Sequence, residues 1–462
     1  MTQPSYLRCL TLFSLAFFLI AALRGENHDP YGGTKTLKTE PTGYFRLDEF
    51  SGRPLLVTPE GHGFIALGIN HISSLERQIE GGIWLRNDDE WDSYWQNTLQ
   101  PQYEAWHCNT MGYGGPTQLR DRLPWFGTIG LALIEKHRSD PKVGSRNHFY
   151  FPDVFDPKWA QEVSTRIEEA ASPHRGDPFL VGWFWTDTPT WDLHKTRALR
   201  RTDWVSELRR RPPDSPGRKA YAKFLLDRYN GDTLGLEELN EFYGLALNHI
   251  EEVRTADLTQ IAIGRHRVQE DDYAFLALIA QRFYDVVGLA QRQASPNHLI
   301  FGDRYLAGDA PTEVLEAARP WIDAVAVQPG DRYSPLYPAS THYPEEDIEH
   351  LHRVTGKPVF ICDHAISFPT EGQPRTIFEQ MPSEEGAAQA TRNFLAEAFS
   401  KPYQLGYLRC QYVDRPAGSG RGLRQGLIFP DGTPREELVK AYRESFGAAI
   451  ETILGQIDSQ EP

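Results

Sequence analysis

The alternation of short apolar runs with amphipathic stretches most constrains the fold of this chain. From about residue 40 onward, mostly apolar runs recur between segments of helical periodicity. Near-continuous apolar runs are typical of parallel strands that are buried on both faces of a sheet. Parallel neighbours need a crossover connection, which is usually a helix. The pattern therefore predicts a parallel sheet whose helices lie outside it.

Eight such runs occur, and each is interpreted as one strand. The predicted strands are 61–72, 108–114, 130–136, 179–187, 298–304, 322–329, 358–364 and 404–414. The predicted helices are 156–171, 273–294, 311–321, 344–354, 384–400 and 435–454. Eight strands that alternate with helices indicate an α/β fold, a (β/α)8 TIM barrel. A doubly wound sheet is the alternative, but no nucleotide-binding fingerprint supports it.

The barrel is expected to span residues 61–455, with additions at two places. Residues 36–60 predict a short N-terminal β-hairpin extension. Residues 190–265 are interpreted as a helical insertion after the fourth strand, on the face where barrel sites lie. This insertion contains a basic run at 197–211, which is interpreted as a solvated helix face, with extension of a substrate groove as the alternative.

The first 25 residues have the pattern of an export signal. Arg8 precedes an apolar run, Leu10 to Leu23, and a polar segment follows it. A run of this length fits the apolar region of a signal peptide and is short for a membrane span. We therefore predict a signal peptide at 1–25 and a periplasmic or extracellular protein. Because no clean A-x-A site follows, an uncleaved signal anchor is the alternative.

Charge and cysteine content exclude several classes of function. The formal net charge of −15 argues against a general binder of nucleic acid or anionic membranes. The four cysteines, at positions 9, 108, 362 and 410, are too few for a disulfide framework and contain no C-x-x-C pair. We expect no cofactor and no metal ligands.

Candidate site residues follow from the barrel prediction, because sites of such barrels lie at the C-terminal ends of the strands. The predicted strand ends supply Asn70, His71, Asp187, Asp303, Arg304, Gln328, Asp363, His364, Arg409 and Gln411. A single aspartate there usually caps a helix or pairs with an arginine. Three that converge on one rim beside aromatic residues favour a catalytic pair of carboxylates, as glycoside hydrolysis requires.

Several segments also resemble a known family in order and spacing. GRPLLVTPEGHGFIALGINHI is similar to the N-terminal hairpin and first strand of agarase-like glycoside hydrolases of the retaining (β/α)8 clan. VGWFWTDTPTW, HLIFGDRYLAGDAPTEVLEAARPWIDAVAVQP, GKPVFICDHAISFP and GYLRCQYVDRPAGSGRGLRQGLI resemble later strands of that group, which includes GH50-type beta-agarases and GH42-like beta-galactosidases. The resemblance covers about residues 40 to 445. It implies a hydrolase of O-glycosidic bonds in a polysaccharide or oligosaccharide, with an agarose-, carrageenan- or porphyran-like galactan as substrate.

At the positions of the family's catalytic residues, this chain has different amino acids. Relatives end strand four in Asn-Glu, whereas an alignment on Trp191 puts Asp187 at the Asn position and Thr188 at the Glu position. A shift of one residue would put Asp187 at the Glu position. Asp363 occupies the position of the nucleophilic Glu on strand seven.

Aspartate is one methylene shorter than glutamate, so the two carboxyl groups should stand further apart. Retaining enzymes hold them about 5–5.5 Å apart and inverting enzymes about 6.5–9.5 Å. An inverting enzyme, a retaining enzyme with readjusted loops and an inactive barrel that binds carbohydrate all remain open.

The expected catalytic residues are Asp187 as the acid and Asp363 as the nucleophile or base. Nearby tryptophans are expected to desolvate Asp187, raise its pKa and contact substrate. These tryptophans are Trp183, Trp185 and Trp191. His71 and His364 either bind substrate and orient a carboxylate, or are satisfied structural histidines.

Two arginines suggest an anionic group in the substrate. Arg304 and Arg409 are expected on the rim, and arginine binds sulfate or carboxylate in a bidentate manner. A sulfated or uronate-containing galactan would then fit better than neutral agarose. Ion pairs with Asp303, Asp363 or Asp414 are the alternative. A metal-dependent hydrolase is a further alternative, although the sequence contains no H-E-x-x-H and no H-x-H on the first strand.

Overall fold

The computed structural model describes residues 27–131, 151–198, 202–230, 234–261, 263–330, 341–376, 381–416 and 422–459. The predicted signal peptide at 1–25 lies outside these residues.

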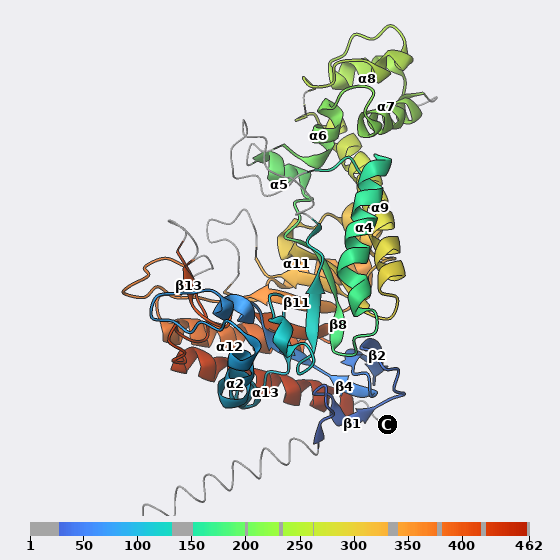
Figure 1. Cartoon of the computed structure of the whole chain (residues 1–462). Helices are drawn as coiled ribbons and strands as arrows, with labels where there is room; N and C mark the ends of the chain where they lie inside the picture. The colour runs from blue at the N-terminus through green and yellow to red at the C-terminus, as the bar shows by residue number, and fades with distance from the viewer. Residues whose placement is uncertain are drawn as a thin grey trace, which may run out of the picture.

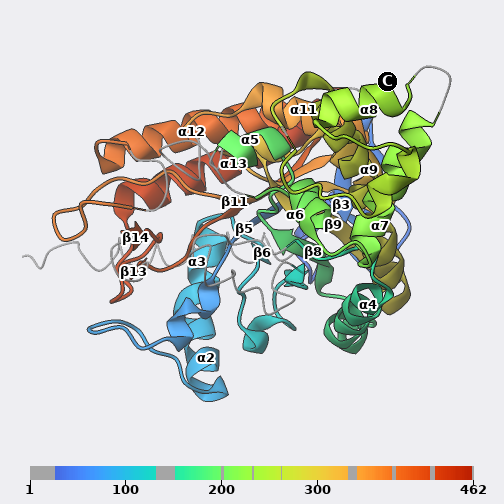
Figure 2. The ribbon, with the colours of Figure 1, turned by 90° about the horizontal axis from the view of Figure 1, so that it is seen from above.

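Eight parallel strands close into a barrel in the order β10-β11-β12-β5-β6-β7-β8-β9. The strands are β5 (Ala66–Ile69), β6 (Thr110–Met111), β7 (Trp125–Thr128), β8 (Leu180–Asp187), β9 (Leu299–Leu306), β10 (Val325–Gln328), β11 (Val359–His364) and β12 (Gln404–Arg409). The last strand pairs with the first through Gly406 and Ala66, which closes the ring. Viewed from above, the strands gather at the centre and helices lie around them (Figure 2). The predicted (β/α)8 fold is confirmed.

Phenylalanines fill the inside of the barrel. Phe126, Phe184, Phe301 and Phe360 form one buried cluster, with Phe126 stacked on Phe184 at 5.2 Å between ring centroids. Side chains therefore pack the barrel as a core, and its chemistry is confined to the mouth.

The prediction of the third strand was wrong. The strand is β7 (Trp125–Thr128) and not 130–136, of which residues 132–136 lie outside the described part. Phe126 of β7 belongs to the phenylalanine cluster, and Gly127 lies so close to Trp183 that a Cβ would come within 2.4 Å of its ring. These contacts with neighbouring strands depend on tertiary packing, which a local pattern does not reveal. The sequence analysis instead selected 130–136 because it is richer in aliphatic residues.

All six predicted helices are present. Five lie within a few residues of their expected bounds, and the helix predicted at 273–294 begins earlier, at His266. They are α4 (Pro157–Ala171), α9 (His266–Ala294), α10 (Thr312–Ala318), α11 (Glu345–Thr355), α12 (Glu384–Ser400) and α13 (Glu436–Asp458). The Asp156 side chain accepts a hydrogen bond from the Lys158 N–H at 2.9 Å and so caps α4 as expected. By length and composition α9 could cross a membrane, but it packs on α4 and α10.

Shorter elements complete the described chain. They are α2 (Asp88–Tyr94), α3 (Gln100–Ala105), β13 (Arg415–Pro416), β14 (Leu423–Arg424), the 3-10 turns η1 (Ile72–Glu76), η3 (Thr117–Leu119), η5 (Ser172–His174), η6 (Ile250–Arg254) and η7 (Ala307–Asp309), and the π turn η2 (Trp95–Leu99).

A small antiparallel sheet lies at one end of the barrel (Figure 1). Its strand order is β1-β4-β3-β2, with β1 (Thr34–Lys38), β2 (Arg46–Phe50), β3 (Arg53–Val57) and β4 (His62–Phe64). The predicted hairpin is β2-β3, and positive φ angles of 47° at Ser51 and 76° at Gly52 form its tight turn. The predicted strand 61–72 is divided, because β4 joins this sheet and only β5 joins the barrel.

Four helices occupy the predicted insertion. They are α5 (Leu193–Ala198), α6 (Trp204–Arg210), α7 (Pro216–Tyr229) and α8 (Leu236–Tyr243). In Figure 1 they lie at the opposite end of the molecule from the small sheet, beside one end of α9. The bounds of the insertion and of the barrel as separate units stay a prediction.

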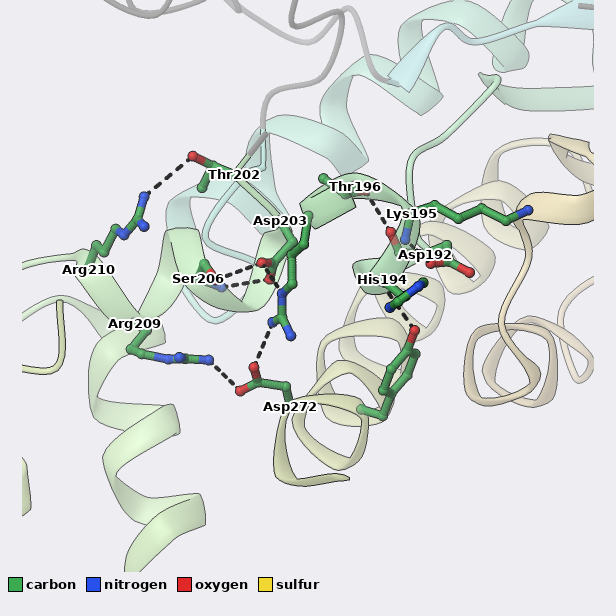
Figure 3. Close-up of polar contacts among 12 residues, drawn as sticks. Asp192, His194, Lys195, Thr196, Thr202, Asp203, Ser206, Arg209, Arg210 and Asp272 are labelled. Carbon is green, nitrogen blue, oxygen red and sulfur yellow. Dashed lines mark hydrogen bonds and ion pairs between the residues drawn. The ribbon is translucent and has the colours of Figure 1, made fainter. Parts of the chain in front are cut away.

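Buried ion pairs attach this insertion to α9. Asp272 of α9 pairs with Arg209 (Figure 3). Asp272 also pairs with Arg197, which in turn reaches Asp203. The Arg197 Nη2 to Asp272 Oδ2 distance is 2.6 Å, and the Arg209 side chain is 2% exposed. The interpretation of 197–211 as a solvated face was therefore wrong for these two arginines.

Candidate active site

Six side chains from different strands meet at the C-terminal mouth of the barrel. They are Asn70, Tyr113, Asp187, Arg304, Gln328 and Asp363. Five of them were predicted as site residues.

Arg304 links the two sides of this site. Its Nη2 lies 3.1 Å from Asp187 Oδ1, and its guanidinium carbon lies 3.8 Å from the centre of the Tyr113 ring. The Arg304 side chain is 4% exposed, and its Nε and Nη1 have no hydrogen-bond partner. Burial lowers the pKa of Arg304, but neighbouring acidic groups, with Asp187 the strongest, together more than compensate, and the pKa is raised. Arg304 is thus a fixed positive charge at the mouth.

Asp187 is the solvent-facing carboxylate of the site. Its side chain is 59% exposed, and Gln328 Nε2 donates to its Oδ1 at 2.8 Å. The next residue, Thr188, has a φ of 44°, and its N–H donates to the Arg304 carbonyl at 3.1 Å. A β-branched residue in this left-handed region is a strained conformation of the kind that clusters at functional sites.

Asp363 is the inner carboxylate. The Tyr113 hydroxyl donates to Asp363 Oδ2, and Asn70 Nδ2 donates to Oδ1 at 3.5 Å. Burial raises the pKa of Asp363, while Arg304 and Tyr113 oppose this change and the charge of Asp187 adds to it. The Asn70 amide also donates to the Cys362 carbonyl at 2.9 Å. A Cβ at Gly112 would lie 1.7 Å from Asn70 Oδ1, so only glycine leaves room for this orientation.

His71 borders the site as a neutral ring. It packs edge-on against Tyr113, with ring centroids 4.6 Å apart. Burial lowers the pKa of His71 to about 3, and the positive charges of Arg424, Arg304 and Arg415 add to this effect. The imidazole therefore carries no charge at neutral pH and is able to hydrogen-bond a sugar hydroxyl.

The three tryptophans near strand four lie outside the site, which corrects their predicted role. Trp183 Nε1 donates to Ser295 at 3.1 Å, and the Trp185 ring packs on Tyr284. Trp191 stacks on Trp204 at 4.5 Å between centroids. All three are at most 2% exposed and fill the layer between the barrel and α9. The desolvation expected to act on Asp187 is therefore not found.

Asp303 and His364 also face the surrounding helices. Asp303 accepts hydrogen bonds from the Thr186 N–H at 3.0 Å and the Tyr284 hydroxyl at 2.7 Å. His364 stacks on Phe394 of α12 at 3.9 Å, and its Nδ1 lies 2.8 Å from the Tyr407 hydroxyl. These contacts favour structural roles for both residues.

Arg409 and Gln411 occupy the end of strand eight, but not as the rim groups that were expected. Arg409 is fully buried, and its guanidinium lies 5.6 Å from the Tyr442 ring of α13. Because side chains alternate along a strand and Leu408 points into the barrel, Arg409 points outward. Gln411 Nε2 donates to the carbonyls of Val413 at 2.7 Å and Arg424 at 3.3 Å.

A separate cavity of about 310 Å³ lies beside the residues that follow β6. It is lined by β6, β7 and the end of α4, and Arg120 stacks over Trp125 there at 4.1 Å. None of the six mouth residues lines this cavity.

Tyr113 is the residue that the sequence analysis left out of the site. It lies two residues after the end of β6, so the rule that selected the other strand ends would have selected it as well.

One group in the described residues has the geometry of a metal site. Asp29, Glu60 and His62 offer ligand atoms within 4.8 Å of one another. The Asp29 carboxylate, however, already accepts hydrogen bonds from the N–H groups of Tyr31 at 2.9 Å and Gly33 at 2.8 Å. This group belongs to the small N-terminal sheet and takes no part in the mouth site.

Comparisons with known proteins show which sequences and folds the chain is similar to. No family model matches the chain. Beta-agarase B of Vibrio sp. (strain JT0107) is 21% identical over 486 residues, which cover 90% of this chain and 49% of that protein. Beta-agarase A of the same strain is 22% identical over 373 residues, which cover 76% of this chain and 36% of that protein. The chain thus spans half the length of these relatives or less.

Solved structures extend the likeness to the fold. An exo-beta-agarase superimposes with a TM-score of 0.76 at 19% identity, over 94% of this chain and 69% of that one. The agarase AgWH50C superimposes with a TM-score of 0.75 at 18% identity, over 98% of this chain and 72% of that one. These likenesses show that the chain shares the barrel fold of solved agarases. Asp187 and Asp363 stand at the ends of the fourth and seventh barrel strands, and Arg304 pairs with Asp187.

Proposed function

We propose that this agarase-like barrel is a glycoside hydrolase that cleaves a galactan with Asp187 and Asp363. The observation that carries the proposal is the placement of both carboxylates around one buried guanidinium at the C-terminal mouth of the barrel. Glycoside hydrolysis needs one carboxyl group that donates a proton and one that attacks or activates water.

Asp363 suits the role of nucleophile or base. Tyr113 and Asn70 both donate hydrogen bonds to it, which favours the ionised form, and Arg304 acts in the same direction. Its raised pKa makes the carboxylate a stronger base than an exposed aspartate.

Asp187 takes the role of the acid. Before it can carry a proton, its ion pair with Arg304 must loosen, and a bound sugar that contacts Arg304 would have this effect. Its exposure places it where a leaving-group oxygen can approach.

The proposed substrate is a galactan of the agarose, carrageenan or porphyran type. The similarity to two beta-agarases supports agarose among these. We also propose that the protein is exported by the apolar segment near its start, which fits a polymeric substrate that does not enter cells.

The test is release of reducing ends from a panel of galactans, both neutral and sulfated. Wild type is compared with Asp187→Asn and Asp363→Asn, which keep the side-chain shape. Asp227→Asn, an exposed change on α7, serves as the control. The proposal is supported if wild type and the control release reducing ends and both site variants do not. Release that persists in both site variants contradicts the assignment of the pair.

A second candidate function is carbohydrate binding without turnover. It is favoured by the Asp187–Arg304 ion pair together with Thr188 at the position of the family's acid. The variant Thr188→Glu distinguishes the two functions. If Thr188 marks a lost acid, this variant gains activity that wild type lacks; if Asp187 is the acid, wild type is active without it.

A further inference from the structure

Two arginines face each other on the ribbon that follows strand eight. Arg415 of β13 and Arg424 of β14 are direct partners in an antiparallel pair. Residues so paired point to the same side with their Cβ atoms about 4.5–5.5 Å apart, and like charges in this arrangement repel each other. A ribbon of two residues per strand is too short to offset this repulsion by its own backbone bonds.

The described residues offer these guanidiniums no counter-charge. Neither Arg415 nor Arg424 forms an ion pair with a described carboxylate, and Arg424 Nε is buried without a hydrogen-bond partner. Burial lowers the pKa of Arg415, and the positive charges of Arg77 and Arg424 lower it further. A local excess of positive charge in a chain of net charge −15 indicates a site for an anion.

The ribbon is held beside the catalytic mouth. Gln411 Nε2 donates to the Arg424 carbonyl at 3.3 Å and so attaches β14 to the end of strand eight. The Leu423 N–H donates to the Arg375 carbonyl at 2.8 Å, which fixes the ribbon to the segment after β11. The charges of both ribbon arginines act on His71, which packs on Tyr113. The two guanidiniums therefore lie near the group that orients Asp363.

We propose that Arg415 and Arg424 form a subsite for an anionic substituent, a sulfate ester or a carboxylate, on a sugar bound at the mouth. Guanidinium groups bind both anions through paired N–H donors, and a bound anion would remove the repulsion between the two arginines. The inference rests on the proposed function for the identity of the sugar chain. Arg415 and Arg424 would then provide the anion selectivity that was expected of Arg409, whose side chain points away from the mouth.

The test measures affinity and not turnover, so that its failure is distinct from failure of the proposed hydrolysis. Three oligosaccharides of one galactan backbone are compared by calorimetry: sulfated, desulfated and oxidised to a uronate. Binding is measured to the wild-type chain, with hydrolysis followed in parallel, and to the double variant Arg415→Gln/Arg424→Gln. Arg254→Gln is the control, because Arg254 is an exposed arginine in the insertion.

We expect wild type and the control to bind one anionic form at least about tenfold more tightly than the neutral form, as charge-assisted hydrogen bonds imply. The double variant should lose this preference. Preference for the sulfated or for the uronate form identifies the anion. Equal affinity for all three forms, or a preference that survives in the double variant, overturns the subsite. Anion-selective binding without any hydrolysis would support the subsite and contradict the proposed function alone.

Discussion

At the scale of the residue, the two aspartates differ in their surroundings more than in their chemistry. Asp187 faces solvent and pairs with Arg304, whereas Asp363 is held by Tyr113 and Asn70. The strand-end rule selected both because it depends only on strand direction. It also selected Asp303, His364 and Arg409, which face the helix layer, because a change of side along the last residues of a strand leaves no mark in the sequence.

Loss of the Tyr113 hydroxyl should shift the pH dependence of catalysis. The Tyr113 hydrogen bond lowers the pKa of Asp363, so Tyr113→Phe should raise that pKa further. If Asp363 acts as an anion, the acidic limb of kcat/KM moves to higher pH, and kcat at neutral pH falls about tenfold. Profiles from pH 4 to 9 check this. Movement of the alkaline limb instead would show that Asp363 acts as the acid.

Asp363 should also decrease the stability of the protein at neutral pH. Because its folded-state pKa is raised above the ordinary 3.8, its contribution to stability is complete at lower pH and is lost as pH rises through the raised value. Asp363→Asn cannot ionise, so it should melt at a higher temperature than wild type at pH 7 and at a similar temperature at pH 4. Melting curves at both pH values test this. If the melting temperature of Asp363→Asn exceeds that of wild type by more at pH 4 than at pH 7, the predicted direction of the pH dependence is contradicted.

At the scale of the element, periodicity predicted the helices well and predicted one strand wrongly. Amphipathic helices carry their own signal, since one face must be apolar wherever the helix packs. A strand as short as β7 is selected by its neighbours, through Phe126 in the barrel and Gly127 under Trp183. The buried arginines of the insertion were missed for the same reason, since their partner Asp272 is distant in the sequence.

The ion pairs between the insertion and α9 should contribute strongly to stability. Asp272→Asn leaves Arg209 buried without its carboxylate, which should cost about 3–5 kcal/mol. Lys223→Ala removes an exposed pair on α7, with side chains 71% and 63% exposed, and should cost less than about 0.5 kcal/mol. Urea unfolding of both variants measures the difference. Equal and small effects would show that the network adds no stability.

At the scale of the whole molecule, the order of the strands was predictable because a (β/α)8 barrel has one strand order around its axis. The small sheet was predictable only as a hairpin, since β1 and β4 join it through pairings that no local pattern specifies. The barrel positions two aspartates and a guanidinium at one mouth, and the function proposed for the chain depends on that convergence.

The most direct test of this account is proton NMR of a galactan oligosaccharide incubated with the full chain. We expect new reducing-end anomeric signals to grow with wild type and not with Asp363→Asn. The first anomer to form also shows whether configuration is retained or inverted. Broadened sugar signals that report binding, with no new anomeric signal from wild type on any galactan, would contradict hydrolysis and leave a carbohydrate-binding barrel.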